Sequence, residues 1–450
     1  MSKFAVIGAG VSGQGLALLA RKLGAEVFVS DKKAINDDVK KLFAENNIAF
    51  EESHSDKIFE NTDAILLSSG LPLNLPVISE AKSRGVRMIG ELDFVLPNLK
   101  ARELICVTGS NGKSTVTALT GHVLNRSGLV AGTGGNLGTA AASFVEKNYD
   151  AVVLELSSFQ LERATKIMNA NVAIITNLAP DHIDWHGSYE NYVAAKAKIL
   201  SLRGENNWGI IQDRDVDMLR ASGKIITLSW REKPEHAHEF AGHIFMDRDC
   251  AWLLMGDSRV RIFDYSDTSL IGSHNLENVA MSLCAYMLVC NVRTEFDARN
   301  LLSGFKPLPH RCEKAGEISG VLYVDDSKGT NVAASVTAMR SINMPKVVIL
   351  GGQGKGEDYA PLAEAVKSEC EAAVVLGSEC EKICDALRNS GFEKFFRVNS
   401  MEEAVDKASE LARPGMCVLL SPACTSWDMY ASYKKRGEHF CRLVQEKLVK

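Results

Sequence analysis

Short apolar runs alternate with amphipathic stretches along the whole chain. Runs such as "FAVIG", "LICVT" and "VVILG" are rich in β-branched residues, and segments with apolar positions at helical spacing lie between them. Fully apolar strands separated by helices are typical of parallel sheets that are covered by helices on both faces. The pattern therefore predicts an α/β fold.

Glycine and polar residues follow these strands in three groups along the chain. Ligands of open α/β sheets bind beyond the carboxyl ends of the strands, so each group indicates one ligand-binding domain. Pro97 and Pro307 stiffen the connectors between the groups. We predict three domains, with bounds 1–93, 94–305 and 306–450, whose loops face a shared cleft.

The periodicity changes between residues 230 and 265. The run "HIFMDRDCAWLLMGDSRVRIF" alternates apolar and polar positions around short polar turns. This alternation is typical of antiparallel strands with one face in solvent. It predicts a small antiparallel meander inserted in the central domain.

Composition narrows the class of protein. The 450 residues are 46% hydrophobic and 24% charged with a net charge of −5, so charge does not favour a nucleic-acid or membrane-surface binder. No apolar run approaches the ~20 residues that span a bilayer, and the first residues lead directly into a strand. The eleven cysteines have no metal-site spacing, and Cys106, Cys417 and Cys424 lie in or beside predicted strands. We expect a cytoplasmic protein with reduced thiols.

The first strand ends in "GAGVSG". Gly8, Gly10 and Gly13 form the G-x-G-x-x-G pattern of Rossmann-like domains, and Asp31 stands about 20 residues further on, where a ribose-binding acid is expected. Taken alone, the pattern favours NAD. A nucleotide-sugar diphosphate would satisfy the same backbone N–H groups, and the glycines could also serve only strand–helix packing.

The stretch "VTGSNGKSTV" predicts a phosphate-binding loop. A strand, a glycine turn and a helix follow one another, Lys113 would reach the β- and γ-phosphates, and Ser114 would offer a hydroxyl to magnesium. Backbone N–H groups around Gly112 would surround the anion. The first glycine, Gly109, stands two positions later than in the usual pattern, so a plain polar turn before a helix remains an alternative.

Two further strand ends carry chemistry. Glu155 ends "DAVVLE", and an acid beside a phosphate loop usually holds magnesium, although it could also be a glutamate that starts a helix. His182 in "APDHIDWH" follows the next strand and is a candidate for the same site. On physical grounds Lys196 in "YVAAKAKIL" is expected to be a solvent-exposed helical lysine. The tract "PEHAHEF" with His243 lacks the ligand spacing of a closed metal site.

At this point the motifs resemble those of the Mur ligases of peptidoglycan synthesis. "TGSNGKST", "LELSSFQLE", "NLAPDHIDWH", "YVAAK", "HNLENVAMS", "LPHR", "DDSKGTN" and "SPACTSWDMY" come in that family's order and cover the whole chain. "LELSSFQLE" and "SPACTSWD" are similar to the members that add D-glutamate to UDP-N-acetylmuramoyl-L-alanine. The family's phosphate loop is shortened in the same way.

The resemblance implies an ATP-dependent, amide-bond-forming ligase that acts through an acyl phosphate and serves cell-wall growth, cell shape and division. It implies ATP and two Mg²⁺ ions as cofactors, a Rossmann-like first domain, a central sheet like that of P-loop ATPases, and a Rossmann-like third domain that closes over the second. It implies no nucleic-acid or membrane partner, and we expect a monomer. An NAD-dependent oxidoreductase and a folylpolyglutamate-type ligase remain the alternatives.

The resemblance also implies roles for individual residues. Those that would bind the UDP substrate are Gly10, Val11, Ser12, Asp31, Ser68, Gly70, Asn136 and His182. Those that would bind ATP are Gly109, Ser110, Asn111, Gly112, Lys113, Ser114, Thr115, Asn278, Arg311 and Asp326. D-Glutamate would be received by Lys328, Thr330, Lys355, Ser426 and Tyr433. Magnesium would be held by Ser114, Glu155, His182 and a carbamylated Lys196. Lys113, His182 and Lys196 would be the catalytic residues.

Overall fold

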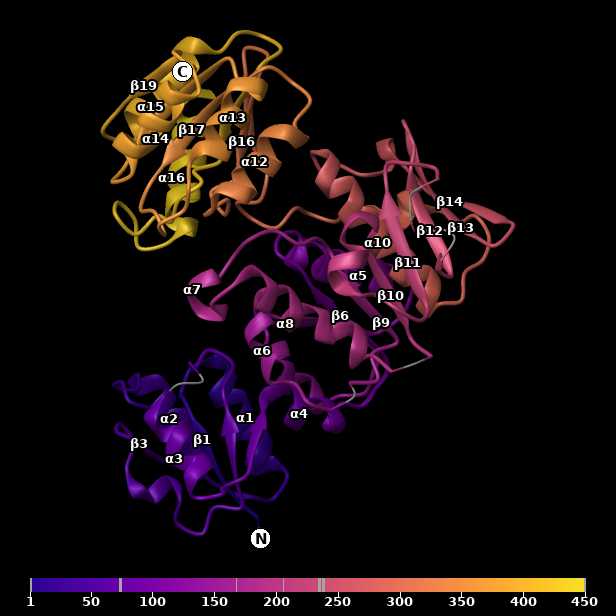
Figure 1. Ribbon diagram of the computed structural model, residues 1–450, viewed down its shortest axis with the longest axis vertical. Coiled ribbons are helices and arrows are strands. Elements are labelled where there is room, and N and C mark those ends of the chain that lie inside the picture. The colour runs from indigo at the N-terminus through magenta and orange to yellow at the C-terminus, as the bar shows by residue number, and fades with distance from the viewer. Residues whose placement is uncertain are drawn as a thin grey trace. The chain divides into compact units, whose positions relative to one another are not determined.

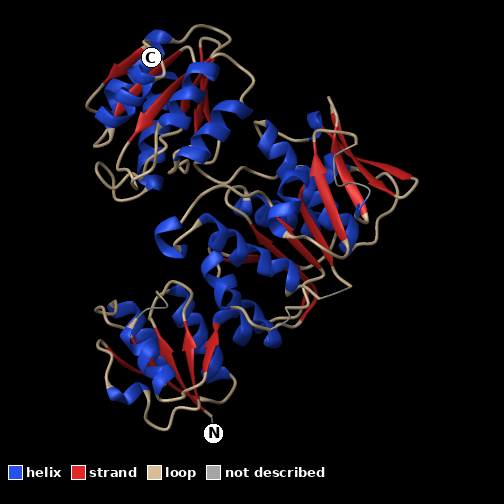
Figure 2. Ribbon diagram, in the orientation of Figure 1, coloured by secondary structure: helices blue, strands red, loops and turns tan. Residues whose placement is uncertain are grey.

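A computed structural model describes residues 2–72, 75–166, 168–204, 206–233, 236 and 239–448. Helices and strands alternate along the chain, which confirms the predicted α/β fold (Figure 2). The chain divides into two compact units. Figure 1 labels helices and strands of both units. One unit contains residues 1–268 and 278–303, and the other contains residues 269–277 and 304–450.

The N-terminal sheet of the first unit has five parallel strands in the order β3-β2-β1-β4-β5. This order is that of one half of a doubly wound nucleotide-binding sheet, as the glycine pattern predicts. The strands are β1 (Lys3–Ile7), β2 (Glu26–Ser30), β3 (Ala49–Glu51), β4 (Ala64–Leu67) and β5 (Met88–Gly90). The helices are α1 (Val11–Lys22), α2 (Asp37–Glu45), α3 (Pro76–Ser83) and α4 (Glu91–Val95).

The central sheet has nine strands in the order β14-β13-β12-β11-β10-β9-β6-β8-β7. The strands are β6 (Ala101–Thr108), β7 (Ala131–Gly135), β8 (Tyr149–Glu155), β9 (Val172–Ile175), β10 (Trp208–Gln212), β11 (Ile225–Ser229), β12 (Gly242–Met246), β13 (Cys250–Met255) and β14 (Ser258–Asp264). The helices are α5 (Lys113–Arg126), α6 (Ser158–Arg163), α7 (Ile183–His186), α8 (Tyr189–Ser201), α9 (Val216–Leu219) and α11 (Ala298–Leu302). Helix α10 (Ser273–Val289) runs from the second unit into the first.

The predicted antiparallel meander is present, but it is not a separate insertion. Strand β12 pairs in parallel with β11, and only β12–β13 and β13–β14 are antiparallel. The meander therefore extends the edge of the main sheet. Residues 234, 235, 237 and 238 of the "PEHAHEF" tract lie outside the described residues. His243 is buried in β12, and its Nδ1 lies 2.8 Å from Thr227 Oγ1.

The second unit contains a six-stranded sheet in the order β15-β16-β20-β17-β18-β19. All its pairs are parallel except β15–β16, so the expected Rossmann-like third domain is present with one antiparallel edge strand. The strands are β15 (Glu313–Ile318), β16 (Val321–Asp325), β17 (Lys346–Gly351), β18 (Ala372–Leu376), β19 (Phe395–Arg397) and β20 (Cys417–Leu420). The helices are α12 (Val332–Ser341), α13 (Ala360–Glu369), α14 (Cys380–Asn389), α15 (Met401–Leu411) and α16 (Tyr433–Leu448).

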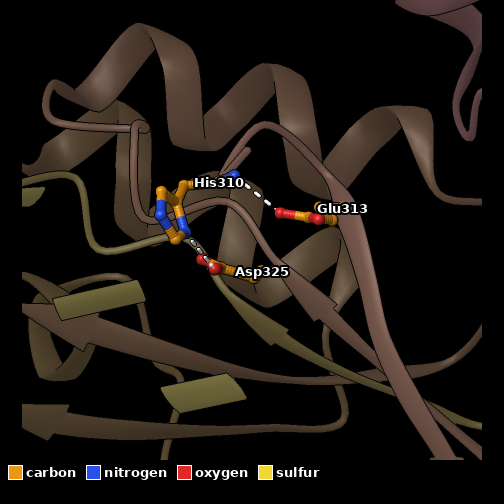
Figure 3. Close-up of side chains that lie close together, drawn as sticks. All are labelled: His310, Glu313 and Asp325. Carbon is orange, nitrogen blue, oxygen red and sulfur yellow. Dashed lines mark hydrogen bonds and ion pairs between the residues drawn. The ribbon is translucent and has the colours of Figure 1, made fainter. Parts of the chain in front are cut away.

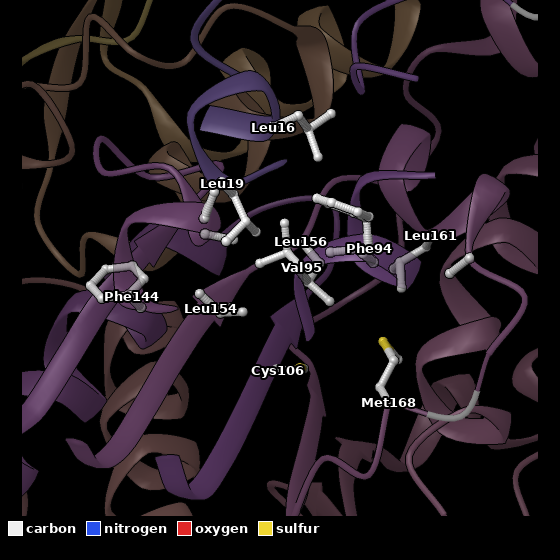
Figure 4. Packing of buried hydrophobic residues seen from close by; sticks show 14 of the residues in the cluster. Leu16, Leu19, Phe94, Val95, Cys106, Phe144, Leu154, Leu156, Leu161 and Met168 are labelled. Carbon is white, nitrogen blue, oxygen red and sulfur yellow. The ribbon is translucent and has the colours of Figure 1, made fainter. Parts of the chain in front are cut away.

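The two sheets of the first unit share one apolar core. Leu16 and Leu19 of α1 belong to the same buried cluster as Phe94, Val95 and Phe144 (Figure 4). The five side chains are between 0% and 9% exposed. Burial of a large apolar side chain contributes about 1.5–3 kcal/mol, so this shared core fixes the glycine turn to the central sheet.

All eleven cysteines are free thiols, as the sequence predicts. Burial raises the pKa of Cys106 and of Cys417 to about 12, so these thiols remain protonated. Among the described helices, none combines the length and the apolar composition needed to cross a membrane.

Candidate active site

The loop between β6 and α5 is tightly packed at its two glycines. Gly109 has φ +145°, and an added Cβ would lie 2.0 Å from Thr176 Oγ1. Gly112 has φ +80°, and its Cβ would lie 2.5 Å from Asn278 Oδ1. Both positions need the left-handed backbone and the small volume of glycine. The structure thus brings Asn278, a predicted ATP contact distant in sequence, against the phosphate loop.

The loop after β9 holds the phosphate loop in place. The backbone N–H of Asn111 donates to Asn177 Oδ1 at 3.0 Å, and Asn177 Nδ2 donates to Asn111 O at 3.0 Å. Ser110 donates through its backbone N–H to Asn177 O at 2.8 Å and through Oγ to Ala179 O at 2.9 Å. These bonds fix the backbone of residues 110 and 111 before any ligand arrives, which is the preorganisation that an anion site needs.

Lys113 is the first residue of α5, and its side chain folds over the loop. Nζ donates to Gly109 O and to Ser110 O, each at 2.8 Å. Ser114 is buried in the first turn of the same helix. The N-terminus of a 14-residue helix favours an anion, and a lysine ammonium adjoins it. The arrangement can therefore hold a phosphate.

The expectation that Lys196 is a solvent-exposed lysine is wrong. The residue is 2% exposed, Nζ donates to Gly109 O at 2.7 Å, and Nζ lies 4.6 Å from the centre of the Tyr192 ring. Burial, and next the charge of Lys113, lower the pKa of Lys196 well below its usual value, while Asp181 and Glu155 oppose this. The spacing of Tyr192, Lys196 and Ile199 puts all three on the buried face of α8, a signal already present in the sequence.

Glu155 ends β8 with one carboxylate oxygen satisfied and one not. Asn136 Nδ2 donates to Oε1 at 2.8 Å, whereas Oε2 is buried and receives no hydrogen bond within the described part of the chain. An unsatisfied buried carboxylate oxygen is unfavourable unless a cation binds it. This unpaired oxygen beside a phosphate loop fits a magnesium ligand.

His182 and its neighbours form an aromatic group after β9. His182 has φ +51° and a side chain that is 44% exposed, and its ring meets the Phe159 ring edge-on at 5.0 Å. His186, which the sequence analysis did not single out, is buried and stacks on the Phe159 ring at 5.7 Å. His186 Nε2 lies 3.0 Å from Ser158 Oγ. The group therefore orients the segment that carries His182.

The N-terminal glycine turn divides into a packed part and an open part. An added Cβ on Gly13 would lie 1.8 Å from Gly8 O, so these two glycines serve strand–helix packing. A Cβ on Gly10 would meet no described atom within 4 Å, and Val11 is 66% exposed. Asp31 Oδ2 accepts from the backbone N–H of Ala9 at 2.7 Å. The open part at residues 10 and 11 is the surface that a ligand can reach.

Arg163 is a buried residue that the sequence analysis missed. Its guanidinium, at the end of α6, donates to Ser68 O and Leu71 O in the loop after β4. Burial lowers the pKa of Arg163. Because α6 begins three residues after Glu155, one short helix ties the loop at 68–71 to the candidate magnesium ligand. Nothing in the local pattern distinguishes this arginine from an exposed one.

In the second unit, the structure brings two predicted D-glutamate contacts together. Lys328 Nζ lies 4.2 Å from the centre of the Tyr433 ring, and the backbone N–H of Thr330 donates to Lys328 O at 2.8 Å. Ser426 is 2% exposed, and its Oγ has no hydrogen-bond partner among the described residues. Lys355 is exposed on the loop after β17. These groups offer two ammonium ions and an unpaired hydroxyl at strand ends.

Arg436 is a second buried arginine that sequence reasoning missed. Its guanidinium donates to Ser327 O at 2.9 Å, Cys424 O at 3.0 Å and Thr425 O at 3.1 Å. Burial lowers the pKa of Arg436 to about 10. The arginine thereby joins the loops after β16 and β20, which carry Lys328 and Ser426.

Asp326 is buried at the end of β16, one residue after Asp325. Its Oδ2 accepts from Ser421 Oγ at 2.7 Å, and its Oδ1 accepts from the Cys312 backbone N–H at 3.3 Å. Burial raises the pKa of Asp326 to about 7. Arg311, the other predicted nucleotide contact in this unit, is half-buried.

Three stretches of the chain match known domain families. Residues 3–74 match the MurD N-terminal domain, residues 107–286 the Mur ligase middle domain, and residues 310–424 the Mur ligase glutamate ligase domain. A UDP-N-acetylmuramoylalanine–D-glutamate ligase of Bacteroides thetaiotaomicron is 35% identical and covers 99% of this chain and 100% of its own length. The chain belongs to the Mur ligase family.

Other Mur ligases agree in sequence and in fold. A UDP-N-acetylmuramoylalanine–D-glutamate ligase of Alkaliphilus metalliredigens is 32% identical and covers 98% of this chain and 97% of its own length. The crystal structure of the MurF ligase of Thermotoga maritima in complex with ADP has a TM-score of 0.59 at 17% identity, and covers 94% of this chain and 95% of that one. The latter likeness shows the shared three-domain α/β fold.

Proposed function

We propose that this chain is an ATP-dependent ligase that adds D-glutamate to UDP-N-acetylmuramoyl-L-alanine in peptidoglycan synthesis. The observation that carries the proposal is full-length similarity to ligases that bear that name. The phosphate loop beside the unpaired Glu155 oxygen supports it. An oxidoreductase would use the N-terminal turn alone and would leave the phosphate loop without a role. A folylpolyglutamate-type ligase is disfavoured by the match of residues 3–74 to the MurD N-terminal domain.

The reaction has two chemical steps. The alanine carboxylate attacks the γ-phosphorus of ATP, and the bond between this phosphorus and the β–γ bridging oxygen breaks. The products are an acyl phosphate and ADP. The D-glutamate amine then attacks the acyl carbon, loses a proton and expels inorganic phosphate. Phosphorylation is needed because a bare carboxylate has no leaving group that an amine can displace. Lys113 would stabilise charge on the transferring phosphoryl group.

Magnesium would bind through Ser114 and Glu155, and a second ion through His182 and Lys196. The unpaired buried Glu155 oxygen fits the first ion. The lowered pKa of Lys196 favours the neutral amine that adds to carbon dioxide, and the resulting carbamate would supply an anionic oxygen in place of an ammonium. When bound, the ions would neutralise charge on the phosphates.

The remaining proposed contacts divide by substrate. The UDP substrate would bind Gly10, Val11, Ser12, Asp31, Ser68, Gly70 and Asn136, and its acceptor end would lie near His182. The nucleotide would also use Asn278, Arg311 and Asp326. D-Glutamate would use Lys328, Thr330, Lys355, Ser426 and Tyr433. The two lysines in this set suit the two carboxylates of D-glutamate. We also propose that segments 1–93, 94–305 and 306–450 are the functional domains of a cytoplasmic monomer.

The test is phosphate release at saturating UDP-N-acetylmuramoyl-L-alanine and ATP with a panel of amino acids. D-Glutamate should support turnover, whereas L-glutamate, L-lysine and diaminopimelate should give little. Lys113→Ala should abolish turnover without unfolding the protein, because this half-buried lysine at the start of α5 contributes little to the core. Lys355→Ala should weaken D-glutamate use far more than ATP use, by roughly 1.5–3 kcal/mol for a charge-assisted contact.

Equal turnover with a diamino acid would contradict the assignment of the amino-acid substrate. Near-normal turnover of Lys113→Ala would contradict the assignment of the phosphate loop. Binding of NADH in preference to UDP ligands would contradict the assignment of the N-terminal turn to the UDP substrate and would favour the oxidoreductase alternative.

A further inference from the structure

His310, Glu313 and Asp325 form a close group in the second unit that none of the proposed roles uses (Figure 3). It is the one group of potential metal ligands found among the described residues. One side-chain atom of each residue is already engaged, because His310 Nδ1 lies 2.7 Å from Asp325 Oδ2 and the His310 backbone N–H donates to Glu313 Oε2 at 2.9 Å. A cation would have to displace these bonds, so the geometry favours a hydrogen-bonded pair over a metal site.

The Asp325 carboxylate is the fixed end of this pair. The residue is 0% exposed at the end of β16, and its Oδ1 accepts from the Ser327 backbone N–H at 2.8 Å. Gly437 of α16 lies against both partners, since an added Cβ would be 2.2 Å from His310 Nδ1 and 2.6 Å from Asp325 Oδ2. Helix α16 can therefore approach the pair only with glycine at this position.

From His310 the contacts continue to the proposed D-glutamate residues. The His310 ring meets the Tyr433 ring edge-on at 6.3 Å, and His310 O accepts from the Lys328 backbone N–H at 3.0 Å. Ser327, which the Asp325 carboxylate holds, donates through Oγ to Tyr433 O at 2.9 Å. The pair is therefore linked to both residues: to Lys328 through the backbone, and to Tyr433 through the His310 ring and through Ser327.

We propose that the Asp325–His310 pair positions Lys328 and Tyr433 and thereby sets the affinity for the incoming amino acid, but not for ATP. The inference rests on the proposed function, because it takes Lys328 and Tyr433 as contacts of D-glutamate. Asp325 and His310 are positioning residues, since both act through their neighbours.

The charge of His310 belongs to this arrangement. The hydrogen bond with Asp325 is the largest influence on its pKa and raises it, with burial opposing. The other groups that face the imidazole are Glu313 of β15, Tyr433 and Glu438 of α16, and Lys328 through the Tyr433 ring. An imidazolium here adds positive charge near the proposed carboxylate site, and that charge is lost as pH rises through the raised pKa.

The experiment compares Asp325→Asn with Cys441→Ala in the full chain. Cys441 Sγ lies 3.3 Å from the same carboxylate oxygen, but the residue stands about two helical turns beyond Tyr433 on α16. Asp325→Asn should raise KM for D-glutamate roughly tenfold, the effect of one charge-assisted hydrogen bond, with KM for ATP unchanged. Cys441→Ala should leave both KM values unchanged.

The pH profile separates positioning from general damage. The ratio of D-glutamate KM values, Asp325→Asn over wild type, should be largest at pH values where only the wild-type imidazole is charged, because loss of Asp325 lowers the pKa of His310. His310→Asn keeps an amide donor near the place of Nδ1 and tolerates the φ of +63°, so it should retain more D-glutamate affinity than His310→Ala. If Asp325→Asn does not fold, the comparison of His310→Asn with His310→Ala still tests the positioning role.

Each outcome has one meaning. An unchanged KM for D-glutamate in Asp325→Asn, or equal losses in His310→Asn and His310→Ala, would overturn the positioning role. A matching rise in KM for ATP would also overturn it, since the effect would then be general. If wild-type protein released no phosphate in response to D-glutamate, the proposed function itself would fail.

Discussion

At the scale of single residues, burial decides what the charged groups of this protein can do. Lys196 and Lys198 are two positions apart on α8, yet Lys196 is enclosed against the phosphate loop and Lys198 is only half-buried. Asp326 is enclosed by Ser421 and Cys312. Because burial penalises the charged form, the lysine releases its proton more readily and the aspartate holds its proton longer.

Lys196→Met should abolish turnover and raise the free energy of unfolding. In wild type the folded pKa of Lys196 lies below the unfolded value, so the lysine destabilises the fold at low pH, and this penalty fades as pH rises from the folded to the unfolded pKa. The gain should be roughly 1–3 kcal/mol at neutral pH in carbon-dioxide-free buffer, and should shrink at alkaline pH. Denaturant titrations at several pH values measure it. The control Lys198→Met replaces a half-buried lysine of the same helix and should give no comparable gain in stability. A loss of stability in Lys196→Met would contradict the prediction.

Asp326→Asn should make stability less dependent on pH. Burial raises the folded pKa of Asp326 to about 7 from 3.8, so wild-type stability falls as pH rises through that window. A difference of one between the folded and unfolded pKa values corresponds to about 1.4 kcal/mol, so the variant should gain on wild type by a few kcal/mol between pH 4 and pH 7 and keep that gain above pH 7. Guanidinium titrations at pH 5 and pH 8 compare the two proteins. Parallel pH profiles would show that the carboxyl is not held protonated.

At the scale of elements, the two ends of α5 carry different constraints. Gly112 before the helix and Gly128 after it both have positive φ values, of +80° and +94°. Only Gly112 also has a close neighbour, Asn278 Oδ1, whereas an added Cβ at residue 128 would meet no described atom within 4 Å. The first glycine therefore serves the site, and the second only ends a helix.

Gly112→Ala should lose more stability than Gly128→Ala and should also lose ATP use. Both alanines bear the strain of a left-handed backbone, about 1–2 kcal/mol, but only the first must also push Asn278 away from the loop. Thermal unfolding and the KM for ATP measure the two effects. If both variants bound ATP equally well, the contact between Asn278 and the loop would have no part in the nucleotide site.

At the scale of the whole molecule, the chain consists of two compact units that are joined at residues 268–269, 277–278 and 303–304. The first contains two sheets with a common core, so the glycine turn and the phosphate loop belong to one folding unit. The second contains the proposed amino-acid site and is held internally by Arg436. A ligand of one unit stabilises that unit directly.

Calorimetry should therefore resolve two unfolding transitions that respond to different changes. UDP at 100 times its Kd should stabilise the first unit, which contains the glycine turn, by about 2.7 kcal/mol, and NAD at the same concentration should not. Arg436→Met should lower the unfolding temperature of the second unit, because the carbonyl groups of residues 327, 424 and 425 lose their buried donors. A single transition that UDP and Arg436→Met both move would contradict independent unfolding of the units.

The fold class, the three groups of strands that end in glycine or polar residues, and the order of the motifs all follow from local patterns in the sequence. Patterns of this kind depend on neighbours along the chain: "GSNGKS" specifies a turn and a helix start wherever it is placed, and an acid after "DAVVL" falls at a strand end. The predicted meander also followed from local alternation. Its union with the main sheet did not, because parallel pairing of β12 with β11 depends on residues distant in sequence.

The surroundings of individual side chains depend on how distant segments pack in the folded protein. The contact of Lys196 Nζ with Gly109 O, the attachment of Arg163 to residues 68 and 71, and the pairing of His310 with Asp325 each join segments that no local pattern connects. The sequence specifies which groups can ionise. Burial and hydrogen-bond partners, which arise when distant segments pack, decide which of those groups are charged and where they point.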